Sequence, residues 1–412
     1  MESSVNRHNC HSMVLGILLL STLAAQAQDG QWREINENKC GRCHRVYDPT
    51  EFSRNEWNQA LHSMRARAGL SKEEHEGLAS LAENGANAEL GERDAPQLGG
   101  YLYTEYFQSP DKIRNYDIHY LAIHLSGWVG DQVEYLGEFE FEHGGKGDNT
   151  FVEQAWMDYW FTHNMALRIG AILTPFNRFD EIHDPLSNPL VTRPQMAREI
   201  GVSAWKDVGV DLHGHFRLSK QLFFDFDIYS INGLGAGSNL RGSRQYRDNN
   251  EDKAFGVRSS FVLSDSYELG MSAYRGAWDD NGDLMLGMIG AHARLRTPLV
   301  NIHAEYADAL SENTGSVADG EMTGYFIQAV RELNSKLKFV ARWGELDYLD
   351  MGSDQGRDPE RGDKDISELA LGLTFSPDPR VIFKLEYSIN GEGARAEAID
   401  NDQLGLQAAV SF

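Results

Sequence analysis

The sequence has no run of 18 consecutive apolar residues and few cysteines. Without such a run, no segment has the length and composition of a transmembrane helix. Three cysteines are too few for the disulfide framework of a small secreted domain. Basic residues are also scarce, because 38 lysines and arginines stand against 62 acidic residues, and the formal net charge is −24. This acidity argues against nucleic acid as a partner.

The first 27 residues have the pattern of a secretory signal peptide. Arg7 precedes an apolar stretch, residues 13–23, and Ala25-Gln26-Ala27 has the small-x-small form of a cleavage site. The apolar stretch is too short to span a bilayer. We therefore expect residues 1–27 to be removed on export, which leaves two cysteines in the mature chain.

These two cysteines belong to the motif Cys40-Gly41-Arg42-Cys43-His44. In an exported protein, C-x-x-C-H predicts covalent attachment of one c-type haem. Cys40 and Cys43 can each form a thioether with the porphyrin, and His44 can then bind the iron as proximal ligand. A zinc site would need two further ligands at comparable spacing, and a redox dithiol would need a βαβ setting. The sequence offers neither, so we expect haem c as the cofactor.

The haem motif lies in a segment, residues 28–85, that has the pattern of three short helices. Ser53-Arg54-Asn55-Glu56 and Ser71-Lys72-Glu73-Glu74 have the form of helix capping boxes. About 60 residues bury little apolar surface alone, and a covalently held porphyrin would supply the missing core. The segment resembles small single-haem cytochrome c domains, in which a Trp-x6-Met helix follows the attachment motif. Trp57 and Met64 match that helix.

Met64 is the expected sixth iron ligand. It shares the apolar face of its helix with Trp57 and Leu61, and Met is a common partner of His in cytochromes c. A space-filling role in the core is the alternative for Met64. His62 is the rival ligand, although two positions away on a helix it points to a different face.

After a polar linker, residues 86–97, the chain changes to alternation with period two. The connections between the alternating segments are short and long in turn, which predicts a closed antiparallel outer-membrane barrel over residues 98–412. An even strand count leaves both ends of the barrel at the rim with the short turns, which is the periplasmic rim. A soluble β-sandwich or β-propeller is the alternative, but neither needs long loops on one side only. Sixteen strands are expected to start near residues 99, 118, 133, 150, 165, 207, 221, 253, 267, 284, 299, 321, 336, 367, 380 and 402.

Loops and aromatic residues complete this predicted barrel. Long loops are expected at 109–117 and, as the longest, at 175–206, among others. Aromatic residues near strand ends are expected to form girdles at the membrane interfaces. Phe412 resembles the terminal aromatic residue by which outer-membrane barrels are recognised for insertion. The girdle residues would be Trp128, Trp156, Tyr159, Trp160, Trp205, Trp278 and Tyr348.

The longest loop lies in a stretch that resembles the phosphate-selective porin O/P family. The resemblance implies a trimeric 16-stranded barrel whose third loop folds inward and narrows the pore. Phosphate selectivity needs a ladder of basic residues in the lumen, whereas residues 98–412 contain 48 acidic and 28 basic residues. We therefore expect no anion selection. The matching segments are residues 151–156, 168–170, 175–179 and 188–194.

Several loops contain further candidate metal ligands. Asp279–Asp283 and the acidic residues between Asp347 and Asp365 could gather hard cations, although the EF-hand spacing is incomplete. The alternative is a set of solvated loops facing lipopolysaccharide. His183 and Asp184, in the third loop, are candidates for residues that line the constriction.

A haem domain at the amino end of a porin-type barrel resembles the fused cytochrome–porin proteins of the outer membrane known from iron-oxidising bacteria. The resemblance implies an electron conduit, with Fe(II):cytochrome c oxidoreductase activity as one form, between an extracellular donor and a periplasmic cytochrome or other carrier. The alternative is a diffusion porin that carries a periplasmic cytochrome c docking or sensing module. A peroxidase would need an open sixth iron position, which Met64 argues against. The haem domain would lie in the periplasm or inside the barrel lumen.

Covalent haem attachment is directly testable. The protein made in a host with haem-ligation machinery should keep its haem on a denaturing gel, because thioether bonds survive unfolding. Replacing both attachment cysteines (Cys40→Ser with Cys43→Ser) should abolish the haem stain. Cys10→Ser, the matched control in the signal segment, should leave the stain unchanged. A haem-free mature polypeptide from such a host would contradict the assignment.

Overall fold

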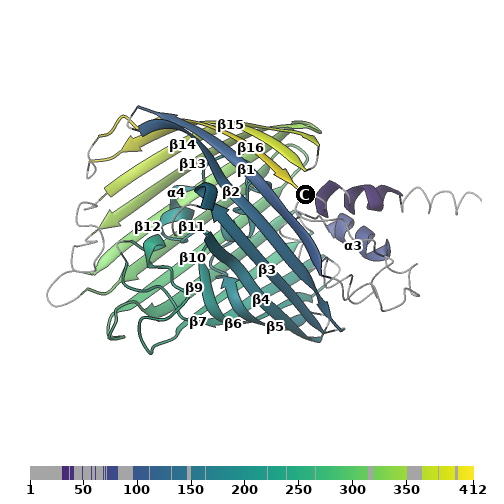
Figure 1. Ribbon diagram of the computed structural model, residues 1–412, viewed down its shortest axis with the longest axis horizontal. Coiled ribbons are helices and arrows are strands. Elements are labelled where there is room, and N and C mark those ends of the chain that lie inside the picture. The colour runs from purple at the N-terminus through teal and green to yellow at the C-terminus, as the bar shows by residue number, and fades with distance from the viewer. Residues whose placement is uncertain are drawn as a thin grey trace, which may run out of the picture.

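Sixteen antiparallel strands form a closed barrel in the computed structural model (Figure 1). Each strand pairs with its neighbours in the sequence, and the first pairs with the last to close the sheet. In the described part of the chain, no helix combines the length and apolar character that crossing a membrane requires. The structure describes residues 30–36, 38–40, 49, 57, 61, 68, 70, 72–81, 96–110, 112–130, 132–145, 150–162, 164–219, 221–237, 239–264, 266–313, 319–349, 364–378, 380–394 and 398–412.

The strands are 9 to 18 residues long, which suits tilted strands that cross a bilayer. They are β1 (Gln97–Ser109), β2 (Lys112–Val129), β3 (Val133–Glu142), β4 (Thr150–Thr162), β5 (Met165–Leu173), β6 (Lys206–Arg217), β7 (Leu222–Ile231), β8 (Ala254–Leu263), β9 (Tyr267–Ala277), β10 (Met285–Arg296), β11 (Asn301–Ser311), β12 (Gly320–Asn334), β13 (Leu337–Leu349), β14 (Lys364–Asp378), β15 (Val381–Glu392) and β16 (Gln403–Ser411). The helical elements are α3 (Lys72–Ser80), η4 (His143–Gly145), η5 (Phe179–Ile182), α4 (Gln195–Glu199) and η6 (Arg241–Ser243).

The predicted strand number is confirmed, and fifteen strands start within three residues of the expected position. The second strand is the exception. The long loop expected at 109–117 is wrong, because β2 begins at Lys112 and Ser109 pairs directly with Lys112. The sequence Ser-Pro-Asp-Lys is typical of a type I turn, in which proline supplies the φ of the first central position. A tight hairpin therefore replaces the loop.

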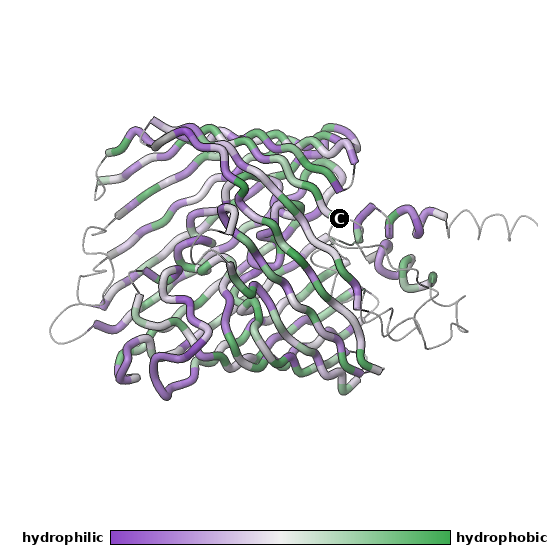
Figure 2. The backbone as a smooth tube through the Cα atoms, in the orientation of Figure 1, coloured by the Kyte–Doolittle hydropathy of each residue, from purple (hydrophilic) through white to green (hydrophobic). Residues whose placement is uncertain are grey.

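The outer surface of the barrel is apolar and its inner surface is polar, as β15 illustrates. Phe383, Leu385 and Tyr387 are exposed at 47%, 43% and 46%, whereas Lys384 and Glu386 between them are buried. A soluble sheet would bury the apolar row instead. The hydropathy of neighbouring residues alternates along many strands in Figure 2. This inverted pattern is that of a barrel embedded in lipid.

The predicted aromatic girdle is wrong for its five tryptophans and for Tyr348, which packs on the buried cluster inside the barrel, whereas Tyr159 is exposed. Trp128, Trp156, Trp160, Trp205 and Trp278 are buried on the inner side, with exposures of 8% or less. On β4 from Gln154 onward, residues of even number face the lumen, so Trp156 and Trp160 point inward. Position near a strand end does not decide the face of a side chain, because the period of two does.

Barrel closure depends on a glycine beside the last residue. Gly100 donates its N–H to the Phe412 carbonyl (3.1 Å) and accepts from the Phe412 N–H (3.0 Å). A Cβ at Gly100 would lie 2.2 Å from the Ala122 carbonyl oxygen and 2.8 Å from the Phe412 ring. Only glycine fits between these neighbours without displacing backbone.

Lipid exposure of the outer face can be tested by depth. Ile327, near the middle of β12, and Leu333, near its short-turn end, are both exposed apolar residues. In lipid vesicles, Ile327→Lys should lower the free energy of unfolding by about 2–4 kcal/mol, and Leu333→Lys by about 0–1 kcal/mol. Denaturant unfolding of both variants measures the difference. Equal losses would show that β12 does not cross a bilayer at this depth.

Candidate functional site in the lumen

The connection between β5 and β6, residues 174–205, folds into the barrel, as the resemblance to the porin O/P family implies; we call it loop L3. L3 contains η5 and α4, and α4 lies against β12 and β13. Its apolar side chains form the largest buried cluster of the barrel together with inward residues of several strands. The L3 members are Phe176, Phe179, Ile182, Met196, Ala197, Ile200, Val202 and Trp205. The lumen is therefore narrowed by a packed segment of the chain.

Buried charged side chains hold the tip of L3 against the far wall. Glu386 of β15 accepts hydrogen bonds from the N–H groups of Val191 (2.6 Å) and Thr192 (2.9 Å) and from the Thr192 hydroxyl (2.5 Å). Arg342 of β13 donates to Glu368 (2.6 Å) and to the Thr192 carbonyl (2.9 Å). These contacts satisfy backbone groups of L3 that are buried away from water.

The base of L3 is held by hydrogen bonds within the loop and by a contact with the near wall. Asp180 accepts hydrogen bonds from the N–H groups of Ala204 (3.0 Å) and Trp205 (3.2 Å), which closes L3 on itself. His183 is buried, and its Nε2 lies 3.4 Å from Oε1 of Glu153 on β4. L3 is thus fixed at both its base and its tip.

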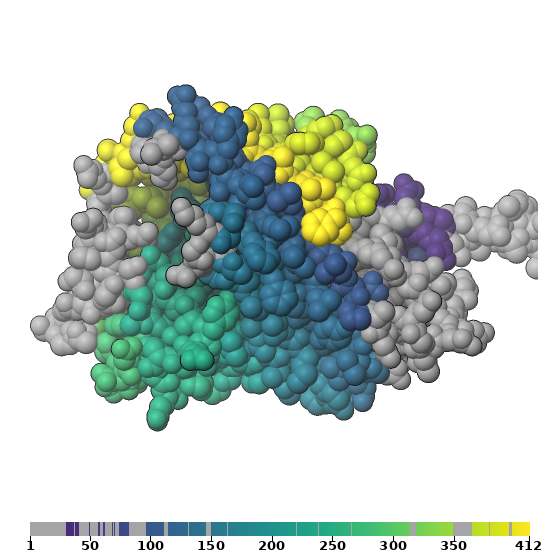
Figure 3. All heavy atoms as spheres, viewed as in Figure 1, coloured from purple at the N-terminus to yellow at the C-terminus, as the bar shows by residue number. Residues whose placement is uncertain are grey.

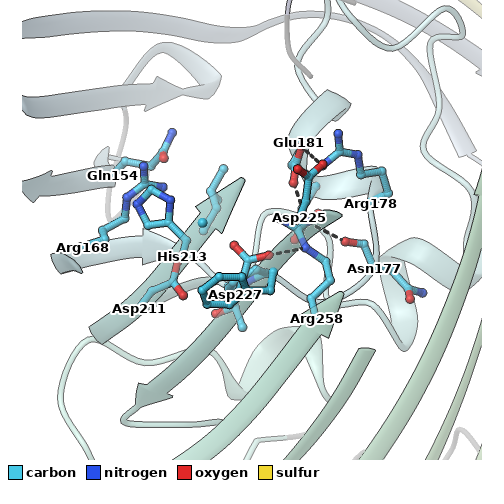
Figure 4. Close-up of a pocket in the computed structure, with 16 residues that line it drawn as sticks. Gln154, Arg168, Asn177, Arg178, Glu181, Asp211, His213, Asp225, Asp227 and Arg258 are labelled. Atoms are coloured by element: carbon cyan, nitrogen blue, oxygen red, sulfur yellow. Dashed lines mark hydrogen bonds and ion pairs between the residues drawn. The ribbon is translucent and has the colours of Figure 1, made fainter. Parts of the chain in front are cut away.

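A cavity of about 160 Å³ lies between L3 and the inner wall formed by β4 to β8 (Figure 4). Arg258 of β8 bridges wall and loop. Its guanidinium lies 2.8 Å from Asp227 and 2.5 Å from Glu181, and it donates to the Asn177 carbonyl at 2.9 Å. Arg178 is also 2.5 Å from Glu181. Two arginines and two carboxylates therefore meet at this side of the cavity.

The opposite side of the cavity has the same character. Arg168 donates to both carboxylate oxygens of Asp158 at 2.8 Å, in the planar two-bond geometry that guanidinium favours. His213 lies 3.2 Å from the same carboxylate, and the Arg168 guanidinium stacks 3.8 Å over the Trp156 ring. The guanidinium is held between an acid and an aromatic face.

Six basic side chains of the inner wall and L3 are paired with carboxylates within 4 Å. Among the described residues, Lys384 of β15 differs, because it donates to the Leu190 carbonyl of L3 at 3.1 Å and forms no ion pair. The pairs are Arg168–Asp158, Arg178–Glu268, Lys206–Glu140, Arg258–Asp227, Arg294–Glu268 and Arg342–Glu368. Bases neutralised in this way contribute little to an anion-attracting ladder.

The loop residues proposed as metal ligands stabilise turns where they are described. Asp184 accepts hydrogen bonds from the N–H groups of Leu186 and Ser187, at 2.9 and 3.0 Å. Asp279 does the same for Asp283 and Leu284, both at 2.8 Å. Of the acidic stretch 347–365, residues 350–363 lie outside the described residues.

The described part of the N-terminal segment packs on the short-turn rim. Its apolar residues share one buried cluster with inward residues of β2, β4 and β5. Arg296, at the end of β10, donates to the Leu70 carbonyl at 3.3 Å. Figures 1 and 3 show the helices beside the barrel end that holds the C-terminus. The cluster joins Trp32, Trp57, Leu61, Leu70, Leu78 and Leu81 to Trp128, Trp160 and Ala166. We call this contact the docking cluster.

Of the predicted haem residues, the structure describes Cys40. Its side chain is buried, and burial raises the pKa of its thiol to about 11. Cys43, His44 and Met64, and the rival ligand His62, lie outside the described residues.

Sequence reasoning missed two features of the lumen. Trp128 and Trp160 are expected in the girdle at the membrane interface, but both occupy inward positions just before short turns. Asp117 was assigned to a loop, although it shares an inner face with His119 on β2 and lies near His143. The Ser-Pro-Asp-Lys turn was the signal that would have extended β2 to include Asp117.

Comparison with known proteins reveals distant similarity. No protein-family model matches the chain. An uncharacterized protein of Aquifex aeolicus strain VF5 is 23% identical over 331 residues, which span 70% of this chain and 74% of that protein. At this identity the similarity does not assign a family.

Solved porin structures show the same architecture. A loop-deletion form of OmpT from Vibrio cholerae aligns with a TM-score of 0.56 and 11% identity, over 77% of this chain and 99% of that one. The channel DcaP of Acinetobacter baumannii gives 0.54 and 10%, over 77% and 97%. The anion-selective porin of Comamonas acidovorans gives 0.53 and 10%, over 77% and 99%. The chain therefore has the 16-stranded fold of outer-membrane porins.

The role of Glu386 in fixing L3 can be tested directly. Glu386→Ala should lower the free energy of unfolding by about 3–5 kcal/mol, because the buried groups that contact Glu386 lose their negatively charged partner. It should also increase single-channel conductance in planar bilayers, since the tip of L3 loses three hydrogen bonds. Glu332→Ala, which removes an exposed carboxylate at the short-turn rim, is the control and should change neither value. Unaltered conductance in a destabilised Glu386→Ala protein would show that L3 does not form the constriction.

Proposed function

We propose that the chain is an outer-membrane porin whose lumen is narrowed by L3. It carries a c-type haem domain that packs on its periplasmic mouth. This domain serves as a docking or sensing module for a periplasmic electron carrier. The docking cluster carries this proposal. It joins the helices to inward tryptophans at the rim where the short turns gather, and short turns face the periplasm in such barrels.

The described residues fit a covalent porphyrin. The helical segment buries Cys40 and has an apolar interior that includes Trp57. A thiol pKa raised by burial is the opposite of the lowered pKa that activates a redox dithiol. Cys40 and Cys43 would form the thioethers, and His44 and Met64 would bind the iron; when bound, the haem supplies one-electron exchange.

A homotrimer is part of this proposal. One similar OmpT structure from Vibrio cholerae is a trimer. The barrel exposes large apolar side chains around its circumference, so lipid and neighbouring barrels can both cover them.

A second candidate function is the electron conduit, favoured by a series of aromatic rings. Trp57 and Trp160 belong to the docking cluster, and the Trp160 ring centroid lies 5.7 Å from that of His213. Trp156, whose ring stacks on Arg168, continues into the cluster around L3. These rings lead from the haem segment into the lumen, as electron exchange with an extracellular donor such as Fe(II) would require.

Conductance tests the docked porin. The purified full-length protein should give small open-channel steps, because L3 and the docked helices narrow the lumen. Gly77→Leu should increase the steps severalfold, because a Cβ at Gly77 would lie 2.3 Å from the Trp32 indole and break the helical packing. Trp343→Ala, on the lipid face, is the control and should leave conductance unchanged. Conductance that is equal in all three proteins would refute docking at the mouth.

Whole-cell reduction separates the two candidates. A porin with a periplasmic module predicts that a reductant too large to cross the outer membrane leaves the haem oxidised in intact cells. The conduit predicts that the same reductant reduces it. Reduction by a small, permeant reductant serves as the control that the haem is redox-active.

A further inference from the structure

Two histidines and two carboxylates gather on the inner wall of the barrel towards the long-loop rim. Asp117 and His119 lie on β2, Glu105 lies on the neighbouring β1, and His143 begins η4. One ligand atom each from Asp117, His119 and His143 lies within 4.8 Å of the other two. We propose that this group binds one divalent first-row transition-metal ion.

The spacing of the donor atoms fits a single ion. Asp117 Oδ2 lies 2.6 Å from His143 Nδ1 and 3.2 Å from His119 Nδ1. His119 Nδ1 is also 3.1 Å from Glu105 Oε2. Ligand atoms at ~2.1 Å from a shared metal are roughly 3.0–3.4 Å apart, which the two distances at His119 match. The 2.6 Å contact is a hydrogen bond that metal binding would replace. The two imidazoles have centroids 5.1 Å apart and planes inclined at 78°, so they approach from different directions.

A β-bulge aims His119 at this position. Tyr103 pairs with Tyr120 whereas Thr104 pairs with Ile118, so His119 has no partner residue across the strands. A bulge of this kind redirects a side chain that regular alternation would turn to the other face. The ring of His119 then stacks on Tyr103, with centroids 5.3 Å apart and an interplanar angle of 27°.

His143 is held in an unusual backbone conformation. Its φ is +50°, and Gly144 and Gly145 follow with φ of +76° and +71°. A non-glycine residue in the left-handed region is strained, and such strain concentrates at functional sites. The conformation brings the imidazole against Asp117.

The surroundings orient the ligands and leave them accessible. Gln407 of β16 donates to Glu105 Oε1 at 2.7 Å, which leaves Oε2 directed at His119. Supporting hydrogen bonds of this type position metal ligands. In the described part of the chain, the side chains within ion-pair distance of Asp117 and Glu105 are these histidines, with no lysine or arginine among them. The side chain of His143 is 46% exposed, so an ion can enter.

The donor set defines the class of metal. Imidazole nitrogen combined with carboxylate suits Zn²⁺, Co²⁺, Ni²⁺ and Cu²⁺, whereas Ca²⁺ and Mg²⁺ favour oxygen ligands alone. The group lies at the opposite end of the barrel from the docking cluster. It therefore binds an ion that arrives through the long-loop mouth, and the site does not depend on haem.

Metal titration of the purified full-length protein in detergent tests the site. In the wild-type protein, d–d absorption should show one saturable equivalent of Co²⁺ per chain, and Zn²⁺ should displace it. His119→Ala should lack this equivalent. His119→Ala and His143→Ala should each weaken binding more than roughly tenfold, and Glu105→Gln roughly tenfold. His215→Ala, which removes another lumen histidine paired with an aspartate (Asp225), is the matched control and should bind like wild type.

Folding is checked separately by the heat-dependent shift of barrels on denaturing gels. His143 is partly exposed in a loop, so His143→Ala should fold even if the bulge variant does not. Equal Co²⁺ affinity in wild type and folded His143→Ala would overturn the proposal, as would the absence of saturable binding in wild type. Either result would make the group a hydrogen-bonded network only.

Discussion

The need to pair every buried backbone polar group governs this structure at two levels. In the bilayer, unpaired N–H and C=O groups are so costly that strands span it only as a closed sheet, and the pairing of β1 with β16 provides that closure. Inside the barrel the same cost applies to L3. There Glu386, Arg342 and Asp180 supply the partners that water supplies to an ordinary loop.

This use of charge explains the character of the lumen. Its acids and bases are largely engaged with each other or with L3, so the interior behaves as a polar core rather than as an open electrostatic filter. The anion-selective porin of Comamonas acidovorans shares the fold, and fold alone does not transfer selectivity. Selectivity depends on which lumen charges are free, and six of the bases beside L3 are paired with acids.

The two ends of the barrel differ in chemistry. The short-turn rim presents Trp128 and Trp160 as an apolar surface, on which the helical segment packs. The long-loop end instead presents histidines and carboxylates, with His119 and His143 partly accessible. The two mouths of the barrel therefore offer different chemistry, an apolar rim covered by helices at one end and a polar rim with histidines and carboxylates at the other.

The sequence by itself determined the number of strands, their approximate limits and the position of the C-x-x-C-H motif, because alternation and motifs are local properties of the chain. The inward course of L3 was expected from the resemblance to a porin family. The sequence could not decide which strand-end tryptophans face the lumen, or that β2 reaches Lys112. Nor could it bring His119, His143 and Glu105 together. Faces and contacts depend on register, and the extra residue of the bulge on β2, His119, reverses which residues of β2 face the lumen on its two sides. Register is set by pairing with neighbouring strands, so only the tertiary structure decided it.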